Sequence, residues 1–469
     1  MFARPALNAV LASSTALLLL AGCEPDEATQ PQPEIATLSE AATPTLAQEV
    51  RALTAGRGIG PMVRPAPVRP ALVQLGQALA FDKILSGNKD ISCMTCHLPR
   101  LGTGDGRSLS IGQGATGLGA DRNHPLGAFI PRNAPQLFNL FAVKSLFWDG
   151  RIELDARGNL VTPAAHRVTP EIQVSFEFGG LSALPLFPVL SRSEMRADDG
   201  NELADVKDKA PQQVWQALMT RLGRVKEYRR MFEEAYPGKK FAAMNFGHAS
   251  NAIAAFFIDQ LAFNDSPWDR FLAGNDAAMT ERQLLGAKNF MSARCSVCHN
   301  GPLLTDNLFH NVAVAQLGPG EGDGGINGAP GPDDFGRMRV TGDRLDRYKF
   351  RTPALRNVEL TGPYGHDGAY LDLEEFVDHY SESHLKLEGF LLGTDPARGR
   401  LELLLGNTVL LNKDDILATR DVLLEGVVFP RHPVIEDVTE FMRALTDPAA
   451  LNLAHLAPGR VPSGLPVDH

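Results

Sequence analysis

Two stretches of the chain place apolar residues at the spacing of an amphipathic helix. The first has Leu72, Leu75 and Leu79 at positions i, i+3 and i+7, and the second has the same spacing between residues 284 and 291. Such spacing puts the apolar side chains on one face of a helix. The sequence Thr-Glu-Arg-Gln at 280–283 also matches a capping box, which marks a helix start. The pattern therefore predicts two helices, each with one buried face.

The N-terminus has a different pattern, that of an export signal. An apolar stretch runs through residues 17–20, and it is shorter than the roughly 20 residues that a membrane-spanning helix needs. It ends in Leu-Ala-Gly-Cys, which resembles a bacterial lipobox with Cys23 as the lipid-bearing residue. We expect a lipoprotein-type signal peptide over residues 1–22 and a location in the periplasm, with membrane contact only through the lipid anchor. An ordinary secretory signal is the alternative.

Residues 23–66 are rich in Pro, Ala, Thr, Glu and Gln and show little periodicity, which predicts a flexible tether. The whole chain of 469 residues is long enough for more than one domain, and its 44 Gly and 33 Pro favour long loops. The 45 Lys and Arg against 55 Asp and Glu give a net charge of −10, which argues against a nucleic-acid partner. The composition also excludes collagen, a coiled coil and a multi-span membrane protein.

Apart from Cys23, the cysteines form two copies of one motif, C-x-x-C-H. This is the attachment signature of c-type haem, in which two thiols bind the vinyl groups and the adjacent imidazole lies under the iron. Zinc sites and thioredoxin-like sites also use C-x-x-C, but neither requires the following His in both copies. The motifs predict two covalently bound haem c groups. The residues involved are Cys93, Cys96, His97, Cys295, Cys298 and His299.

An apolar helix precedes each motif, so the chain has the pattern of a duplicated haem-binding module. The predicted fold is mainly α, with two cytochrome c-like haem domains and long loops. We expect an N-terminal haem domain over residues 67–275 and a C-terminal haem domain over residues 276–460.

The chain resembles the bacterial dihaem cytochrome c peroxidases and their relative MauG over about residues 70–450. The resemblance depends on several separated motifs, which together are specific although each alone is weak. These motifs, besides the second haem run, are the segments 81–97, 131–135, 147–151, 193–195, 350–357 and 360–368.

The resemblance implies that the N-terminal haem reacts with hydrogen peroxide and that the C-terminal haem relays electrons. It places a relay tryptophan between the haems at Trp148. It also implies a calcium site made by Asn133 and the backbone carbonyls of Thr361 and Pro363, since neutral oxygens suit a hard cation. A structural core tryptophan and ordinary turn chemistry are the alternatives.

The family uses a glutamate to move a proton between the peroxide oxygens, six residues after a proline that crowds the open face of the haem. Pro188 and Glu194 have this spacing, and a methionine follows the glutamate as in the family. Two differences from the family pattern weaken this assignment of Pro188 and Glu194. An insertion separates these residues from Trp148, which leaves Glu171 as a rival base, and Leu184 stands where the family often has glutamine.

The second haem shows the largest departure. Fourteen residues after His366, the classical peroxidases place an axial methionine, whereas this chain has Tyr380. MauG also has a tyrosine there. Tyr380 continues the apolar face of a predicted helix, and His379, His384 or Met338 remain as alternative ligands. A phenolate is a hard anion that favours ferric and higher states, so the first haem would react without prior reduction.

Three functions fit these observations. The first is a peroxidase that takes electrons from a small cytochrome c or a cupredoxin. The second is a MauG-like oxidase that acts on residues of an oxidisable partner protein. The third is a non-catalytic dihaem electron carrier, against which the spacing of Pro188 and Glu194 argues.

Overall fold

The computed structural model describes residues 44–125, 129–155, 157, 160–161, 168–320, 333–395, 411–427 and 432–469. The predicted signal peptide over 1–22, Cys23 and the first part of the predicted tether lie outside the described residues. Within these ranges, no helix is long and apolar enough to cross a membrane.

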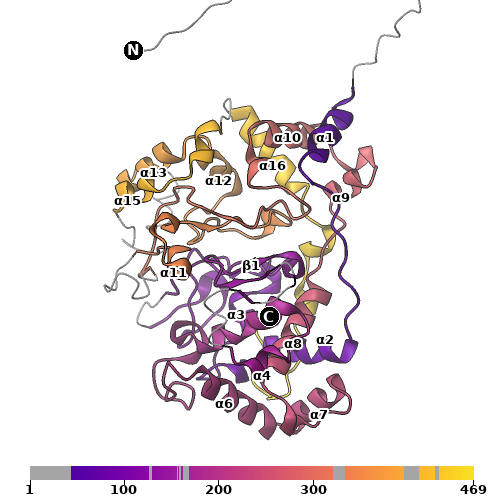
Figure 1. Cartoon of the computed structure of the whole chain (residues 1–469), viewed down its shortest axis with the longest axis vertical. Coiled ribbons are helices and arrows are strands. Elements are labelled where there is room, and N and C mark those ends of the chain that lie inside the picture. Colours follow the sequence, from indigo (N-terminus) through magenta and orange to yellow (C-terminus); the bar gives the residue numbers. More distant parts are fainter. Residues whose placement is uncertain are drawn as a thin grey trace, which may run out of the picture. The chain divides into compact units, whose positions relative to one another are not determined.

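The described part of the chain is mainly helical, which confirms the predicted fold class (Figure 1). The helices are α1 Leu46–Ala55, α2 Pro70–Phe81, α3 Cys93–Cys96, α4 Pro170–Gln173, α5 Gly179–Ala183, α6 Pro211–Arg224, α7 Lys226–Ala235, α8 Phe246–Gln260, α9 Pro267–Leu272, α10 Glu281–Ser292, α11 Met338–Thr341, α12 Leu373–His379, α13 Ser383–Leu392, α15 Lys413–Ala418 and α16 His432–Arg443.

The strands are short and form two antiparallel pairs. In the first pair, β1 (Ser145–Leu146) lies beside β2 (Ile152–Glu153). In the second pair, β3 (Phe309–His310) lies beside β4 (Phe350–Arg351), with Phe309 opposite Arg351. Long loops connect these pairs to the helices, as the glycine and proline content predicts.

Two helix pairs repeat the same packing. In one pair α2 packs on α8, and in the other α10 packs on α16. Gly76 of α2 and Gly286 of α10 lie at the crossings, where an added Cβ atom would be 1.8 Å from the carbonyl oxygen of Ala252 or Asp437 respectively. Only glycine allows so close an approach of two backbones. The same close glycine contact in both helix pairs supports the duplicated module that the sequence predicts.

The close contact between α10 and α16 leads to a testable prediction about stability. Replacing Gly286 by Ala should lower the free energy of unfolding by about 1–3 kcal/mol or more, because the helices must separate to admit the methyl group. Thermal unfolding followed by circular dichroism measures the effect. Gly459→Ala is the control, because a Cβ atom there meets no atom within 4 Å. Equal stability of the two variants would contradict this description of the crossing.

Each helix pair is the centre of a separate apolar core. The first core surrounds α2 and α8, and Leu72, Leu75 and Leu79 are fully buried in it. The second core surrounds α10 and α16. The α10 helix begins with the predicted capping box, in which Thr280 and Gln283 each accept a backbone hydrogen bond from the other. Both predicted helices and their buried faces are therefore confirmed.

The N-terminal boundary of the packed structure differs from the prediction. Part of the segment predicted as a tether forms α1, which packs against α10 and contributes to the second core. Lys288 and Glu49 connect the two helices through an ion pair of 2.7 Å. Trp268 and Phe271 of α9 also belong to the second core, although they precede the predicted boundary at residue 276. The predicted tether is therefore wrong for residues 46–55.

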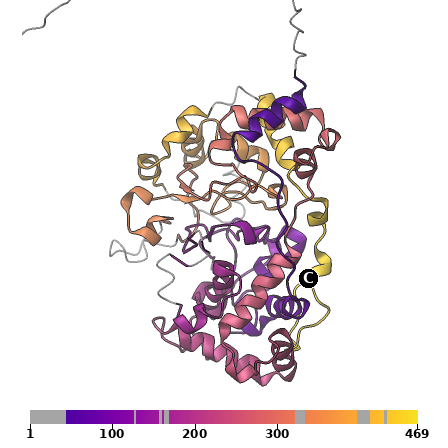
Figure 2. The same ribbon diagram turned by 45° about the vertical axis from the view of Figure 1, so that its right-hand side comes forward.

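The C-terminal segment crosses back to the first core. Ala450, Leu453 and Leu456 are buried there although the prediction assigns them to the second domain. Figure 2 shows this segment, in yellow, running from the second group of helices towards the first. Near its end, the carboxylate of Asp468 accepts a hydrogen bond of 2.5 Å from the hydroxyl of Thr95, inside the first C-x-x-C-H motif. Each core is thus completed by segments distant in sequence.

Candidate functional site

The first cavity of the structure lies beside α3, which carries the first C-x-x-C-H motif. Cys93, Cys96 and His97 all line it. The Nδ1 atom of His97 donates a hydrogen bond of 2.9 Å to the carbonyl oxygen of Thr103. Since Nδ1 is used, Nε2 is the ring nitrogen that can bind a metal ion. Burial lowers the pKa of His97, which keeps the imidazole neutral and able to act as a ligand.

The second cavity repeats this arrangement around the second motif. Cys295, Cys298 and His299 line it. The Nδ1 atom of His299 donates a hydrogen bond of 3.0 Å to the carbonyl oxygen of Leu304. Burial lowers the pKa of His299 as well. Two thiols and one oriented neutral imidazole at a cavity wall are the donor set that haem c requires, so the residues of both cavities fit this cofactor.

The predicted peroxide-reactive residues meet in the first cavity. Pro188, Glu194 and Met195 line the same cavity as His97, together with Leu184. Glu194 lies in a short π-helical turn, Arg192–Arg196. The backbone nitrogen of Gln113 holds this turn in place through a hydrogen bond of 3.0 Å to the Glu194 carbonyl. The alternative base, Glu171, lies outside this cavity. Glu171 lies in α4, is exposed to solvent and does not line this cavity.

Trp148 lies at the boundary of the two cavities and lines both of them. Its indole nitrogen donates a hydrogen bond of 2.9 Å to the carbonyl oxygen of Asn133. Its own carbonyl accepts a hydrogen bond of 2.8 Å from the backbone nitrogen of Arg351 in β4. Trp148 is therefore fixed by one residue from each half of the chain.

A buried ion-pair cluster joins the two halves next to Trp148. Arg132 contacts Asp149 at 2.8 Å and Asp334 at 2.5 Å, and all three side chains are nearly inaccessible to water. Burial alone would raise the pKa of Asp149, but the guanidinium groups of Arg151 and Arg132 outweigh it and lower the pKa. The cluster keeps both carboxylates charged, so it orients the segments that carry Trp148 rather than moving protons.

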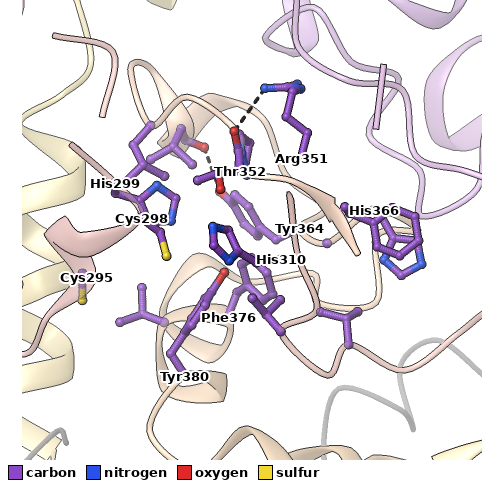
Figure 3. A pocket seen from close by; sticks show the side chains of 18 of the residues that line it. Cys295, Cys298, His299, His310, Arg351, Thr352, Tyr364, His366, Phe376 and Tyr380 are labelled. Carbon is purple, nitrogen blue, oxygen red and sulfur yellow. Dashed lines mark hydrogen bonds between the residues drawn. The ribbon is translucent and has the colours of Figure 1, made fainter. Parts of the chain in front are cut away.

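Tyr380 lines the second cavity and follows directly after α12. Leu373, Phe376 and Val377 of α12 line the same cavity, so the apolar face predicted from the sequence points into it. Figure 3 shows the hydroxyl group of Tyr380 directed towards the region of Cys298 and His310. The phenolic oxygen is thus available at the cavity that holds the second C-x-x-C-H motif.

The three alternative ligands lie away from this cavity. His379 is buried, and both of its ring nitrogens are used, since Nδ1 accepts a hydrogen bond of 2.8 Å from Tyr370 and Nε2 donates one of 2.7 Å to the carbonyl of Val312. His384 is exposed to solvent. Met338 is buried but does not line the second cavity.

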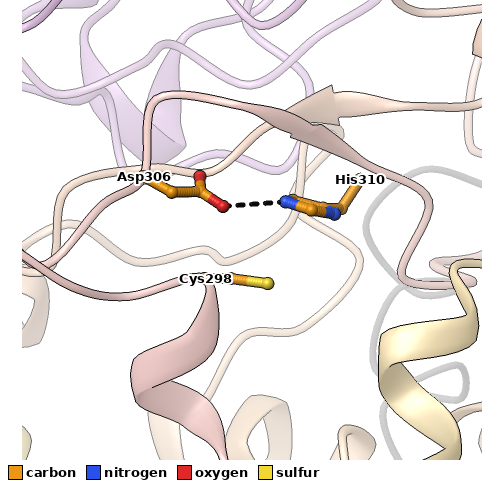
Figure 4. Close-up of side chains that lie close together, drawn as sticks. All are labelled: Cys298, Asp306 and His310. Carbon is orange, nitrogen blue, oxygen red and sulfur yellow. Dashed lines mark hydrogen bonds and ion pairs between the residues drawn. The ribbon is translucent and has the colours of Figure 1, made fainter. Parts of the chain in front are cut away.

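His310 also lines the second cavity, and the sequence motifs did not identify it. Its ring lies between two carboxylates, 2.9 Å from Asp306 and 2.5 Å from Asp421. Burial alone would lower the pKa of His310, but hydrogen bonds with Asp306, Cys298 and Asp421 outweigh it and raise the pKa to about 11. His310 is therefore a fixed cation beside Cys298 (Figure 4). Both of its ring nitrogens contact carboxylate oxygens, so neither is held towards the cavity.

The three predicted calcium ligands line one cavity. Asn133, Thr361 and Pro363 all line the second cavity, and Asn133 also lines the first. The amide nitrogen of Asn133 donates a hydrogen bond of 2.8 Å to the carbonyl of Arg107, which leaves Oδ1 as the side-chain atom suited to a cation. A side-chain amide oxygen and two backbone carbonyl oxygens are neutral donors of the kind that calcium binds.

Known proteins are similar to this chain in sequence. The di-haem cytochrome c peroxidase family matches residues 70–277. Cytochrome c551 peroxidase of Pseudomonas aeruginosa is 30% identical over 315 residues, covering 67% of this chain and 73% of that protein. MauG, the methylamine utilization protein of Methylorubrum extorquens, is 28% identical over 323 residues, covering 68% of this chain and 71% of MauG.

A solved structure extends the similarity over more of the chain. The crystal structure of a MauG-like protein associated with microbial copper homeostasis matches with a TM-score of 0.57 and 26% identity, covering 85% of this chain and 95% of that one. Together with the two C-x-x-C-H cavities, these similarities establish the cofactor class. The chain belongs to the di-haem cytochrome c peroxidase family and is an oxidoreductase that uses peroxide with two haem c groups.

Proposed function

We propose that this protein reduces hydrogen peroxide at the first cavity with electrons that a small cytochrome c or a cupredoxin delivers. The observation that carries the proposal is that Glu194 and Pro188 line the same cavity as His97. A haem bound there supplies an iron that binds peroxide and changes its oxidation state. Glu194 takes a proton from one peroxide oxygen and returns it to the other, so that water can leave. Pro188 crowds the face opposite His97 and offers no ligand of its own.

Trp148 is the proposed electron relay between the two cavities. Its ring is accessible from both cavities, while its indole nitrogen and its carbonyl are held by hydrogen bonds. A fixed aromatic ring between the cavities would divide electron transfer from one bound haem to the other into two shorter steps. With a haem in each cavity, Trp148 would let the two oxidising equivalents of peroxide be shared between them.

Tyr380 is the residue that, together with His299, would bind the iron of a haem in the second cavity. Among its rivals, His379 has both nitrogens occupied and His384 points to solvent. A phenolate oxygen favours the oxidised states of iron, whereas a thioether favours reduction. Tyrosine ligation therefore supports a protein that reacts with peroxide without an activating reduction.

Calcium and a membrane anchor complete the proposal. A calcium ion at Asn133, Thr361 and Pro363 would hold the two halves together beside Trp148. The lipobox-like sequence at Cys23 would anchor the exported protein to a membrane from the periplasmic side.

Steady-state turnover tests the proposed reaction. We expect hydrogen peroxide to be consumed together with two equivalents of reduced cytochrome c or cupredoxin. A MauG-like oxidase is the second candidate, and the tyrosine at position 380 together with the similarity to MauG favours it. Peroxide consumption that requires an oxidisable protein, and that neither small donor supports, would replace the peroxidase proposal with the oxidase one.

Haem content gives an independent check on the two sites. The mature protein should carry two haems that survive denaturation and acid-acetone extraction, because each is attached by two thioether bonds. Replacing both Cys295 and Cys298 by Ala should leave one haem, and the reciprocal change at Cys93 and Cys96 should also leave one. Extracted haem is quantified by its pyridine complex. One haem per chain in the unmodified protein would contradict the two-site description.

A further inference from the structure

Arg351 is a buried cation without a carboxylate partner. Its side chain is 6% exposed, and it lines both cavities from its place in β4. The guanidinium donates one hydrogen bond of 3.2 Å to the carbonyl of Phe147. It donates another of 3.2 Å to the carbonyl of Thr352 (Figure 3). Within the part of the chain that the structure describes, no Asp or Glu lies within ion-pair distance of it.

Other buried arginines in the described ranges show how unusual this is. Arg132 is neutralised by two aspartates, and Arg356 pairs with Asp269 at 2.9 Å. Arg122 has no carboxylate, but three of its nitrogens donate to backbone carbonyls, and it lines neither cavity. Arg351 uses two of its five N–H groups on protein atoms and keeps the rest at the junction of two cavities.

A buried charge is costly unless an opposite charge accompanies it. Burial lowers the pKa of Arg351 to about 10, which still leaves the side chain charged at neutral pH. The holoprotein supplies the missing anions, because each haem c carries two propionate carboxylates that the thioether bonds do not use. A guanidinium binds a carboxylate through two parallel hydrogen bonds, so the free N–H groups match this group in charge and geometry.

We propose that Arg351 anchors a haem propionate at the boundary between the two cavities. The inference rests on the two haems of the family and is independent of the peroxidase reaction. The contact with Phe147, which lines the first cavity, directs the guanidinium towards the first haem, and the contact with Thr352 keeps it beside the second. The anchored propionate belongs to one of these haems, and the experiment below identifies which.

Arg351 also contacts Trp148, so it connects the position of the bound haem with that of the proposed electron relay. The backbone nitrogen of Arg351 donates to the carbonyl of Trp148, while the side chain holds the propionate. One residue of the C-terminal half therefore fixes the haem edge and Trp148 relative to each other. Arg351 acts as a positioning residue, and its loss should disturb the haem environment without removing a haem.

Resonance Raman spectroscopy of the oxidised dihaem protein tests the proposal through the propionate bending bands. In Arg351→Gln, we expect the band of one haem to shift and the midpoint potential of that same haem to fall, because a positive charge near the iron is lost. The haem with the altered potential identifies the source of the propionate. Arg351→Lys keeps the positive charge but cannot form two parallel hydrogen bonds to a carboxylate. The midpoint potential of the haem should therefore stay close to that of the unmodified protein, while the propionate bending band still shifts.

Arg151→Gln is the matched control. Arg151 also lines the first cavity, but it already pairs with Asp149, which keeps Arg132 as a second partner. The control should leave the propionate bands unchanged. Unchanged bands in Arg351→Gln, or an equal shift in Arg151→Gln, would overturn the proposal.

A crystal structure of the unmodified holoprotein tests the contact between Arg351 and a propionate even if Arg351→Gln fails to fold. The proposal requires a propionate oxygen within about 2.7–3.2 Å of a guanidinium nitrogen of Arg351. A guanidinium that contacts only carbonyls and water, with all four propionates elsewhere, would overturn it.

Discussion

Replacing Glu194 by Gln should slow the reaction of the protein with hydrogen peroxide by about 10²–10⁴-fold, the usual contribution of a general acid–base group. Glutamine keeps the shape of the side chain but cannot accept and return the proton. The absorption spectrum of the resting protein should stay nearly unchanged, because Glu194 is not expected to bind iron. Stopped-flow mixing with peroxide measures the rate.

Glu171→Gln is the matched control for this experiment. Glu171 is the rival base from the sequence, but it is exposed to solvent and does not line the first cavity, so its substitution should leave the rate unchanged. A normal rate in Glu194→Gln combined with a slow rate in Glu171→Gln would mean that the insertion after Trp148 has moved the base. The proposed proton transfer would then be wrong.

Tyr380→Met should convert the protein into one that needs reduction before it reacts with peroxide. A thioether in place of a phenolate raises the midpoint potential of the second haem and prevents that haem from storing an oxidising equivalent. Haem attachment should remain, because Cys295 and Cys298 are unaffected. Spectroelectrochemical titration measures the potential, and mixing the ferric variant with peroxide measures the loss of reactivity.

Tyr380→Phe separates ligation from packing. The second haem should become open or water-bound, with an altered spin state in the electron paramagnetic resonance spectrum. Tyr364→Phe is the control, because Tyr364 lines the same cavity while its hydroxyl donates to the carbonyl of Val358. An unchanged spectrum in Tyr380→Phe would return the search to His379, His384 or Met338, and the mechanism to reductive activation.

Local signals in the sequence predicted the parts of the site that are close together along the chain. The C-x-x-C-H motifs need only five consecutive residues, and the spacing of Leu72, Leu75 and Leu79 within one helix identified its buried face. The position of Tyr380 also followed from one helix period. These features depend on short-range geometry, which a sequence contains directly.

The remaining features depend on residues far apart in sequence. His310 meets Asp421 across 111 positions, and Arg132 meets Asp334 across 202. No local sequence pattern predicts such pairs. The charge state of His310, and the lack of a carboxylate near Arg351 among the described residues, become visible only when the chain is folded.

Composition misled the prediction at the N-terminus. Residues 23–66 have the composition of a tether, yet residues 46–55 form α1, which is stabilised by its contacts with α10. Tertiary packing overrides weak local signals in such segments. Tertiary packing also explains why Ala450, Leu453 and Leu456 belong to the first core, although the prediction assigned them to the second domain.

Rapid mixing of the fully ferric protein with hydrogen peroxide tests the central claim most directly. Absorbance and electron paramagnetic resonance should show both haems changing together, with loss of both ferric signals and without any added electron donor. This result requires the open first cavity, the relay at Trp148 and an oxygen ligand at the second haem. If the ferric protein does not react until one electron per chain has been added, the second haem is a reducible store and its ligand is not Tyr380.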